Sequence, residues 1–282
     1  MHNDTKELIS CHLRKYVEGF ESQNKASLSL QNISVANISN MINGKWEKIS
    51  NELWMTVASQ IGVHQVQWVV VETPNFKKLG HLFLDAKQSG IVFGVIGDAS
   101  VGKTEAAKSF SKKYSHIYHV KCDEFWNRKT FLEEILRSAN LDISGSIPEM
   151  MIDLVRHVWR THQPLFVFDE IDKVHDNILC ALISIYNRLE GHAGIVVMAT
   201  DHLKRRIETG IRLNKKGYKE LYSRLDKKFI VLKPTSRADI EAIIRANGIL
   251  DENKIAEIYN DCDYDLRRVK KLVQAAKKKG AI

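Results

Sequence analysis

The sequence has few cysteines and no long apolar run. The cysteines, Cys11, Cys122, Cys180 and Cys262, include no C-x-x-C pair, which argues against a disulfide framework or a zinc site and favours reduced thiols. No apolar stretch approaches the ~20 residues that cross a bilayer. The first residues, MHNDTKELIS, lack the apolar core of a signal peptide. Neither an internal repeat nor a low-complexity tract is evident. We therefore expect a globular, cytoplasmic protein with no membrane partner.

Positive charge is concentrated in the last third of the chain. The formal net charge is +8 over 282 residues. Residues 201–282 hold 21 Lys/Arg and 12 Asp/Glu, whereas residues 1–200 are close to neutral. A basic region of this size indicates an anionic partner, most simply nucleic acid. The alternative is a solvated basic surface that only aids solubility.

The segment 97–104 has the sequence GDASVGKT and fits G-x-x-x-x-G-K-[ST] at every fixed position. An apolar run precedes it and good helix formers follow, as a phosphate-binding loop between a strand and a helix requires. Its glycines let backbone N–H groups turn toward phosphate oxygens, and the helix dipole favours the negative charge. Lys103 is expected to reach the β- and γ-phosphates, and Thr104 to ligate Mg²⁺. The alternative is a chance glycine loop before a helix. The residues predicted to bind nucleotide are Gly97, Asp98, Ala99, Ser100, Val101, Gly102, Lys103, Thr104 and Glu105.

A second motif, PLFVFDEID, places two carboxylates after four apolar residues. We expect Asp169 to hold Mg²⁺, directly or through water, and Glu170 to orient and deprotonate an attacking water. The alternative is a strand that ends in an acidic helix start, where Asp and Glu are favoured anyway. The later run GIVVMAT ends at Thr200, which is predicted to sense the γ-phosphate, with Asp201 as the alternative. An ordinary strand end remains open for this position.

The N-terminal segment, residues 1–62, is predicted to be all-α. Ser34 is a good N-cap for a helix over 35–42, and Gly44 is able to end it in the left-handed conformation. Several short helices with a tight turn before the third are typical of a helix-turn-helix domain, with 35–42 as the recognition helix. A protein-binding helical bundle is the alternative, because the segment is nearly neutral. The predicted DNA contacts are Ala36, Asn37, Ser39, Asn40 and Lys45.

The remaining chain is predicted to be a linker and two further parts. In the linker, 63–74, residues 66–71 could pair as a strand, and Thr73-Pro74 is expected to break structure. Alternating helix and strand patterns over 75–233 predict an α/β nucleotide-binding core with a parallel sheet. Three short helices over 234–282 would form a small lid. The basic residues expected to face DNA are Lys204, Arg205, Arg206, Lys215 and Lys216.

The motifs GDASVGKT, FVFDE, VVMAT, SRLDKKF and DLRRVKKL, in this order, resemble those of the AAA+ ATPases over about residues 75–279. The resemblance implies a P-loop AAA+ core that hydrolyses ATP with Mg²⁺. It also implies that Arg224, before the last strand, acts in trans on a neighbouring subunit, and that Arg267 of the lid senses the γ-phosphate in cis. Spacing alone would make both surface arginines. The sequence departs from many members in having no asparagine at the first sensor position.

A helix-turn-helix segment before a compact AAA+ module is similar to the transposition B-protein family of phage Mu and its bacterial relatives. This resemblance implies ATP-dependent, largely non-specific binding to double-stranded DNA, a filament or ring of identical subunits, and delivery of target DNA to a transposase. The location would be a bacterial or phage-infected cytoplasm. Three alternatives stay open: a replication initiator or transcription regulator with sequence-specific DNA binding, a helicase, because residues 169–172 fit D-E-x-D, and a protein-binding module.

Overall fold

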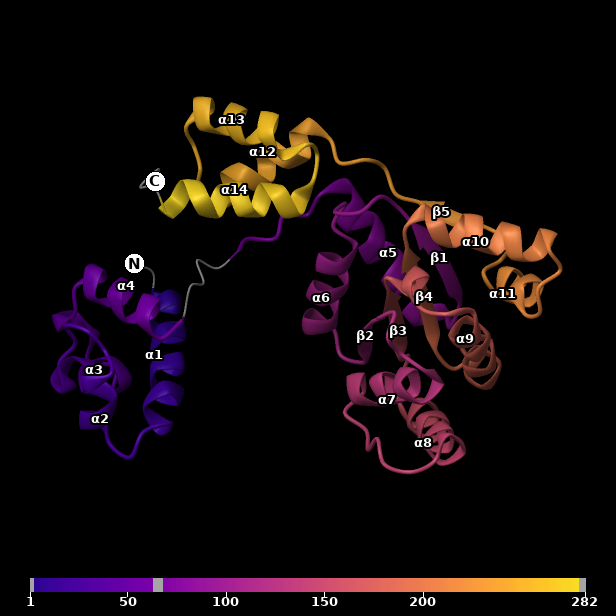
Figure 1. Ribbon diagram of the computed structural model, residues 1–282, viewed down its shortest axis with the longest axis horizontal. Helices are drawn as coiled ribbons and strands as arrows, with labels where there is room; N and C mark the ends of the chain where they lie inside the picture. The colour runs from indigo at the N-terminus through magenta and orange to yellow at the C-terminus, as the bar shows by residue number, and fades with distance from the viewer. Residues whose placement is uncertain (1–2, 63–67, 279–282) are drawn as a thin grey trace. The chain divides into compact units, whose positions relative to one another are not determined.

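The computed structural model describes residues 3–62 and 68–278. The chain divides into two compact units, residues 1–69 and 70–282, whose elements are labelled in Figure 1. Within the described ranges, no helix has the length and apolarity to span a membrane. The strand expected at 66–71 falls partly outside the described residues, and residues 68–73 form no strand.

The first unit is a small bundle of α-helices. Serine N-caps start three of its helices: the side chains of Ser22, Ser34 and Ser50 each accept a hydrogen bond from the backbone N–H three residues on. The expected Ser34 cap is therefore confirmed, and so is the extent of the third helix. The helices are α1 (Asn3–Glu18), α2 (Gln23–Leu28), α3 (Val35–Ile42) and α4 (Asn51–Gln60), with a short 3₁₀ turn, η1, at Trp46–Lys48.

Apolar side chains at helical spacing hold this bundle together. Leu13 of α1, Ile38 and Met41 of α3, and Trp54 and Val57 of α4 have no exposed surface and pack in one cluster. Burial of side chains of this size stabilises a fold by about 1.5–3 kcal/mol each. The polar side chains of α3 are therefore left on the outside of the bundle. The assignment of this unit as a helix-turn-helix domain stays a prediction.

The second unit contains a sheet of five parallel strands in the order β2-β3-β4-β1-β5. The parallel α/β core expected from the sequence is thus confirmed. Residues of β3 and β4 are buried throughout, as central strands covered on both faces require. The strands are β1 (Val92–Ile96), β2 (Ile117–Lys121), β3 (Leu165–Asp169), β4 (Gly194–Ala199) and β5 (Phe229–Val231).

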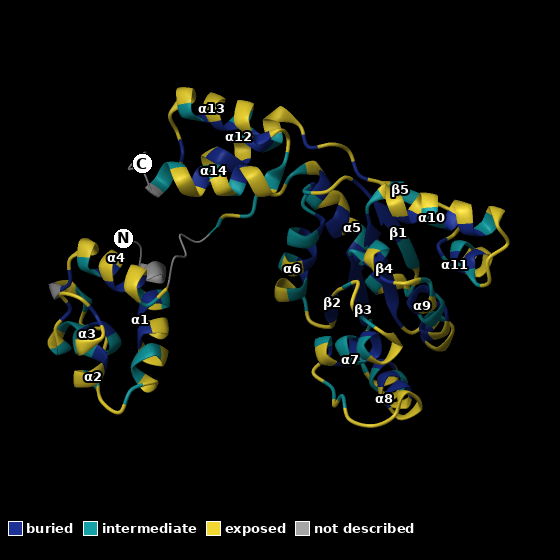
Figure 2. Ribbon diagram, viewed as in Figure 1, coloured by how far each residue is buried: buried dark blue, intermediate teal, exposed yellow. Residues whose placement is uncertain are grey.

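Helices cover both faces of this sheet (Figures 1 and 2). On β3, Leu165 and Val167 pack in the cluster with α5 (Pro74–Ser89) and α6 (Lys103–Lys113). Phe166 and Phe168 alternate with them and pack in the cluster on the other face. That face is covered by α7 (Arg128–Ser138), α8 (Ile147–Arg160), α9 (Asp176–Leu189), α10 (Asp201–Arg212) and α11 (Tyr218–Arg224), with a short 3₁₀ turn, η2 (Ile171–Lys173), after β3.

The segment Thr73-Pro74 begins a helix, which corrects the expectation that it breaks structure. The Thr73 hydroxyl accepts a hydrogen bond from the backbone N–H of Phe76 at 3.3 Å. Proline is well suited to the first helical turn, where its missing N–H would have no partner within the helix. Next to it, the Asn75 amide donates to the carbonyl of Lys233 at 2.7 Å, so the start of α5 is attached to the chain beyond β5.

Three helices close the chain, as the sequence predicts. They are α12 (Arg237–Ala246), α13 (Glu252–Cys262) and α14 (Leu266–Lys278). They contact one another through buried apolar side chains such as Ile240, Ile255 and Val269. Their status as a lid domain separate from 75–233 remains a prediction.

Candidate functional site

The predicted phosphate loop joins the carboxyl end of β1 to the start of α6. Each of its fixed glycines has its own physical reason. A Cβ at Gly97 would lie 2.9 Å from the Cβ of Leu232, so close packing excludes a side chain there. Gly102 has a φ of +92°, a conformation that strains other residues. Gly102 also caps α6 without a side-chain hydrogen bond, which leaves the positive end of this helix to an external anion.

Lys103 lies under this loop. Its Nζ donates hydrogen bonds to the carbonyl oxygens of Gly97, at 2.6 Å, and Asp98, at 2.8 Å. Only 8% of the residue is exposed. Burial lowers the pKa of Lys103, while the nearby carboxylates, Asp169 first among them, act in the opposite direction. The ammonium group is therefore held inside the loop, where phosphate oxygens would replace the two carbonyls.

Asp169 ends β3 at the same edge of the sheet and is fully buried. Its Oδ2 accepts a hydrogen bond from Nε2 of His119 at 3.3 Å, whereas Oδ1 has no hydrogen-bond partner among the described residues. Burial acts to raise the pKa of Asp169, but His119, Thr104 and Lys103 outweigh it and lower the pKa overall. An ionised carboxylate with one unpartnered oxygen beside a threonine hydroxyl is a donor set that suits Mg²⁺.

The described residues contain no group of three or more His, Cys, Asp or Glu side chains placed to hold a metal ion. A phosphate-loop site needs fewer, because a threonine hydroxyl and one aspartate hold the ion together with the phosphates of the nucleotide. Thr104 and Asp169 are the residues here that fit this requirement.

Glu170, the predicted general base, lies in a cationic environment. Its carboxylate is 2.6 Å from Nζ of Lys173, 3.6 Å from Nη2 of Arg267 and 3.8 Å from Nζ of Lys121. Its backbone has a φ of +56°, in the left-handed region that residues other than glycine rarely adopt. The structure thus brings Arg267, from α14, to the carboxylate predicted to activate water.

Thr200 lies at the end of β4, where the sequence predicts a sensor side chain. Its hydroxyl and its backbone N–H both donate to Oδ2 of Asp172, at 2.5 and 3.1 Å. The side chain therefore orients the segment that follows Glu170, and its role as a γ-phosphate sensor stays a prediction. The alternative residue, Asp201, is exposed and pairs with Arg205 at 2.7 Å.

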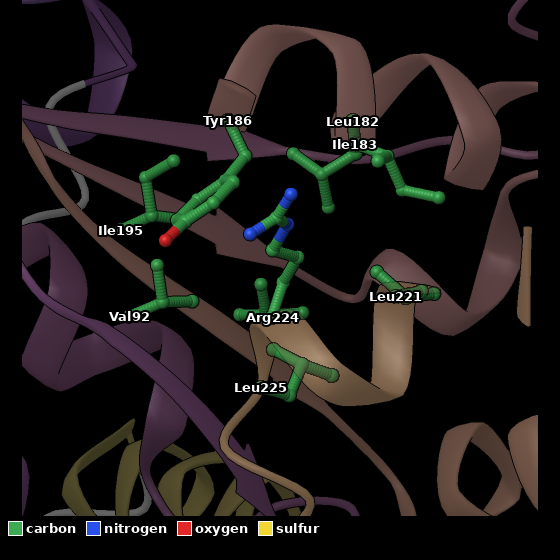
Figure 3. Close-up of a pocket in the computed structure, with 9 residues that line it drawn as sticks. Val92, Leu182, Ile183, Tyr186, Ile195, Leu221, Arg224 and Leu225 are labelled. Atoms are coloured by element: carbon green, nitrogen blue, oxygen red, sulfur yellow. The ribbon is translucent and has the colours of Figure 1, made fainter. Parts of the chain in front are cut away.

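Arg224 lies far from the phosphate loop of its own chain. It lines a small apolar cavity with Val92 and Ile195, which are at or next to the amino ends of β1 and β4, whereas the loop follows the carboxyl end of β1 (Figure 3). The guanidinium lies over the ring of Tyr186, 5.0 Å from its centroid, and 3.9 Å from the carboxylate of Glu190. Contact with a nucleotide would therefore require a second subunit.

Four of the five basic residues expected to face DNA are exposed: Lys204, Arg205, Lys215 and Lys216. Their ion pairs join exposed side chains, such as Lys204 with Glu208 at 3.9 Å and Lys215 with Asp176 at 3.4 Å. Exposed pairs of this kind contribute about 0–1 kcal/mol, so they leave these cations available to an anionic partner.

Arg206 does not face outward, which corrects the expectation that it lies on a DNA-facing surface. Only 18% of its side chain is exposed. Nη1 donates to the carbonyls of Val174, at 2.7 Å, and Asp172, at 3.2 Å, and Nη2 lies 2.5 Å from Oδ1 of Asp176. The reason is helical phase: Arg206 adjoins the buried Ile207, on the side of α10 that packs inward.

The polar residues predicted on α3 lie on its outer side. Ala36 is exposed, and Asn37, Ser39 and Asn40 are partly exposed. Lys45, which follows the helix, is exposed too. Ser39 accepts a hydrogen bond from the amide of Asn43 at 3.2 Å, on the same outer side of the bundle.

Sequence reasoning missed several residues of the site. His119 and Lys121 come from β2, and the parallel register of β2 with β3 places Lys121 beside Asp169. No local sequence motif predicts that register. Asp172 could have been predicted as a site residue, because D-E-x-D places a third carboxylate near the first two. Its hydrogen bond with Thr200 could not, because that bond depends on how β3 and β4 pair.

Residues 86–207 match the family model described as an AAA domain. The chain is 25% identical over 256 residues to the ATP-dependent target DNA activator B of Escherichia phage D108, a match that covers 88% of this chain and 80% of that protein. A crystal structure of NtrX from Brucella abortus in complex with ATP aligns with a TM-score of 0.45 at 12% identity, over 89% of this chain and 61% of that one.

Replacement of Lys103 by alanine is expected to weaken ATP affinity by about 100-fold or more, because a charge-assisted contact to phosphate is lost from a buried position. Binding of a fluorescent ATP analogue measures this. Lys108→Ala, which removes an exposed lysine from the same helix, is the matched control and should bind as wild type does. Equal affinity in the Lys103 variant, with an unchanged thermal midpoint, would refute the assignment of the loop.

Proposed function

We propose that this chain, which contains an AAA ATPase domain, is an ATP-dependent DNA-binding protein that assembles on double-stranded DNA and presents target DNA to a transposase. One observation supports the proposal most directly: a phosphate loop, a buried Asp169 and an adjacent Glu170 meet at one sheet edge. They do so in a chain similar, over 88% of its length, to a phage target DNA activator.

In this proposal the residues at the sheet edge divide the work of ATP hydrolysis. Lys103 and the N-terminus of α6 neutralise phosphate charge, and Thr104 and Asp169 hold Mg²⁺. When bound, the ion supplies charge neutralisation for the phosphates. Glu170 accepts the proton of the water that attacks the γ-phosphate. Arg267, whose Nη2 lies 3.6 Å from the Glu170 carboxylate, contacts that γ-phosphate. Thr200 fixes Asp172 and thus acts on the site indirectly.

We assign the DNA-facing surface to the exposed basic side chains of α10 and the segment that follows it. Lys204, Arg205, Lys215 and Lys216 are near one another in sequence, and the excess positive charge of the chain is confined to residues 201–282. The outer face of α3 is assigned as a second contact, made by Ala36, Asn37, Ser39, Asn40 and Lys45. Most of these side chains are short, and three are polar, which suits close approach to duplex DNA. The single lysine among them contributes little to the affinity for DNA.

Assembly of identical subunits would complete the site. Arg224 is held at the amino ends of the strands, away from the phosphate loop of its own chain. An arginine supplied by a neighbour accelerates phosphoryl transfer by about 10³–10⁵ in enzymes of this kind. We propose that Arg224 fills this role in a filament or ring, so that assembly on DNA and ATP turnover depend on each other.

Exchange of Glu170 for glutamine should leave ATP binding intact and slow hydrolysis by about 100-fold or more, because the amide cannot accept the proton of water. Phosphate release under saturating ATP measures turnover, and the fluorescent analogue measures binding. Glu257→Gln, which removes an exposed carboxylate from α13, is the control and should retain the activity. If Glu170→Gln hydrolysed ATP at the wild-type rate, Glu170 would lose its assigned role.

The salt dependence of DNA binding tests the assigned surface. Each phosphate contact contributes about 0.9 to the slope of log affinity against log salt concentration. Joint replacement of Lys204, Lys215 and Lys216 by glutamine is therefore expected to reduce that slope by about 2–3. The control removes the same charge from exposed positions on α6: Lys108, Lys112 and Lys113. Equal slopes in the two triple variants would show that the DNA-facing surface is elsewhere.

A further inference from the structure

The segment 170–176 runs from the end of β3 to the first residue of α9 and carries Glu170 at its start. Its interior is anchored by burial, since Ile171 and Val174 are 0% and 1% exposed. Its polar groups are held by α10. Thr200, the N-cap of this helix, binds the side chain of Asp172. Arg206, further along the same helix, binds the backbone carbonyls of Asp172 and Val174. The conformation of the residues after Glu170 is therefore fixed from a different part of the chain.

Glu170 itself needs such support. A non-glycine residue in the left-handed region is strained and persists only when its surroundings enforce it. The φ of +56° sets the direction in which the Glu170 side chain leaves the backbone, and hence the position of its carboxylate. If the segment could relax, the backbone would return to a more favourable region and the carboxylate would move.

Arg206 makes more contacts with this segment than any side chain described above. Its guanidinium donates to two backbone carbonyls, of Asp172 and Val174, and to the carboxylate of Asp176. The hydroxyl of Tyr218 also donates to Asp176, at 2.6 Å. Tyr218 and Arg206 together lower the pKa of Asp176 to about 2, so this carboxylate remains ionised and paired throughout the physiological range.

Only arginine can make this set of contacts. The planar guanidinium presents five N–H donors in a fixed fork, whereas a lysine ammonium is a single point charge with three donors. A lysine at 206 could pair with Asp176, but it could not bind both carbonyls in the same plane. The two backbone contacts are thus the ones that a lysine substitution would remove.

We infer that Arg206 is a positioning residue for the predicted general base, because it locks the segment 170–176 in the conformation that aims Glu170. This inference rests on the proposed ATP hydrolysis and deepens it. It also connects the proposed DNA surface with the catalytic site through one helix. The outer face of α10 carries Lys204 and Arg205 of the proposed DNA surface, and its inner face carries Arg206, which binds the segment that contains Glu170.

The test compares Arg206→Lys with Arg188→Lys, the same exchange at an exposed position on α9. A misplaced catalytic group costs up to about 100-fold in rate. Arg206→Lys is therefore expected to lower kcat for ATP hydrolysis by about 10- to 100-fold, with the affinity for the fluorescent ATP analogue within about twofold of wild type. Arg188→Lys should leave both quantities unchanged.

Amide hydrogen exchange in the nucleotide-free protein gives a second readout, independent of turnover. Faster exchange confined to residues 171–176 is expected in Arg206→Lys, including the N–H groups of Lys173 and Val174, which donate to Glu170 and Ile171. A merely structural role would raise exchange across the sheet and lower the thermal midpoint. Wild-type kcat in Arg206→Lys, or loosening of the whole unit, would overturn the inference.

Glu170→Gln separates this inference from the proposed function. If that variant is inactive and Arg206→Lys is not impaired, only the positioning role fails. If Glu170→Gln hydrolyses ATP normally, the catalytic assignment fails and the inference falls with it. Tyr218→Phe removes one hydroxyl from Asp176 and keeps both backbone contacts of Arg206, so a loss of kcat smaller than in Arg206→Lys is expected; an equal or larger loss would contradict the role given to those contacts.

Discussion

The site depends on one buried carboxylate. An ionised group removed from water costs several kcal/mol unless charges and hydrogen bonds compensate, and Asp169 is fully buried. His119, Thr104 and Lys103 supply that compensation from two elements: His119 from the neighbouring strand β2, and the other two from the start of α6. Because each of them must lie close to Asp169, the carboxylate fixes how β2, β3 and α6 meet. The unpartnered oxygen that remains is the feature that fits a cation.

The order of strands explains why these groups gather at one edge. In a parallel sheet all carboxyl ends point the same way, so the ends of β1, β3 and β4 bring the phosphate loop, Asp169 and Thr200 to a common edge. Glu170 and Asp172 follow directly from β3, and α10 follows directly from β4. The helix with the exposed basic residues therefore begins at the nucleotide edge. This adjacency gives a physical basis for the proposed link between DNA contact and hydrolysis.

The sequence predicted what local chemistry determines. The bounds of α3 were predictable because a serine cap and apolar spacing act within a few residues, and the strands were predictable because buried parallel strands are short apolar runs. The failures concern long-range partners. Arg206 was placed on the surface because its neighbours are exposed and basic, yet Asp176, 30 residues earlier, draws it inward. The bond between Thr200 and Asp172, and the approach of His119 to Asp169, follow from strand register, which no single segment encodes. Thr73-Pro74 was misread because the same pair that interrupts a strand also starts a helix.

In the proposed function, bound nucleotide controls the affinity of the protein for DNA. The most direct measurement is the affinity of the full chain for a long duplex of arbitrary sequence, with ATP and Mg²⁺ and without nucleotide, together with the sedimentation of the protein in each condition. The account predicts large assemblies and tight binding with ATP, and weak binding by small species without it. Equal affinity in both conditions, from a protein that stays monomeric with ATP, would contradict the account.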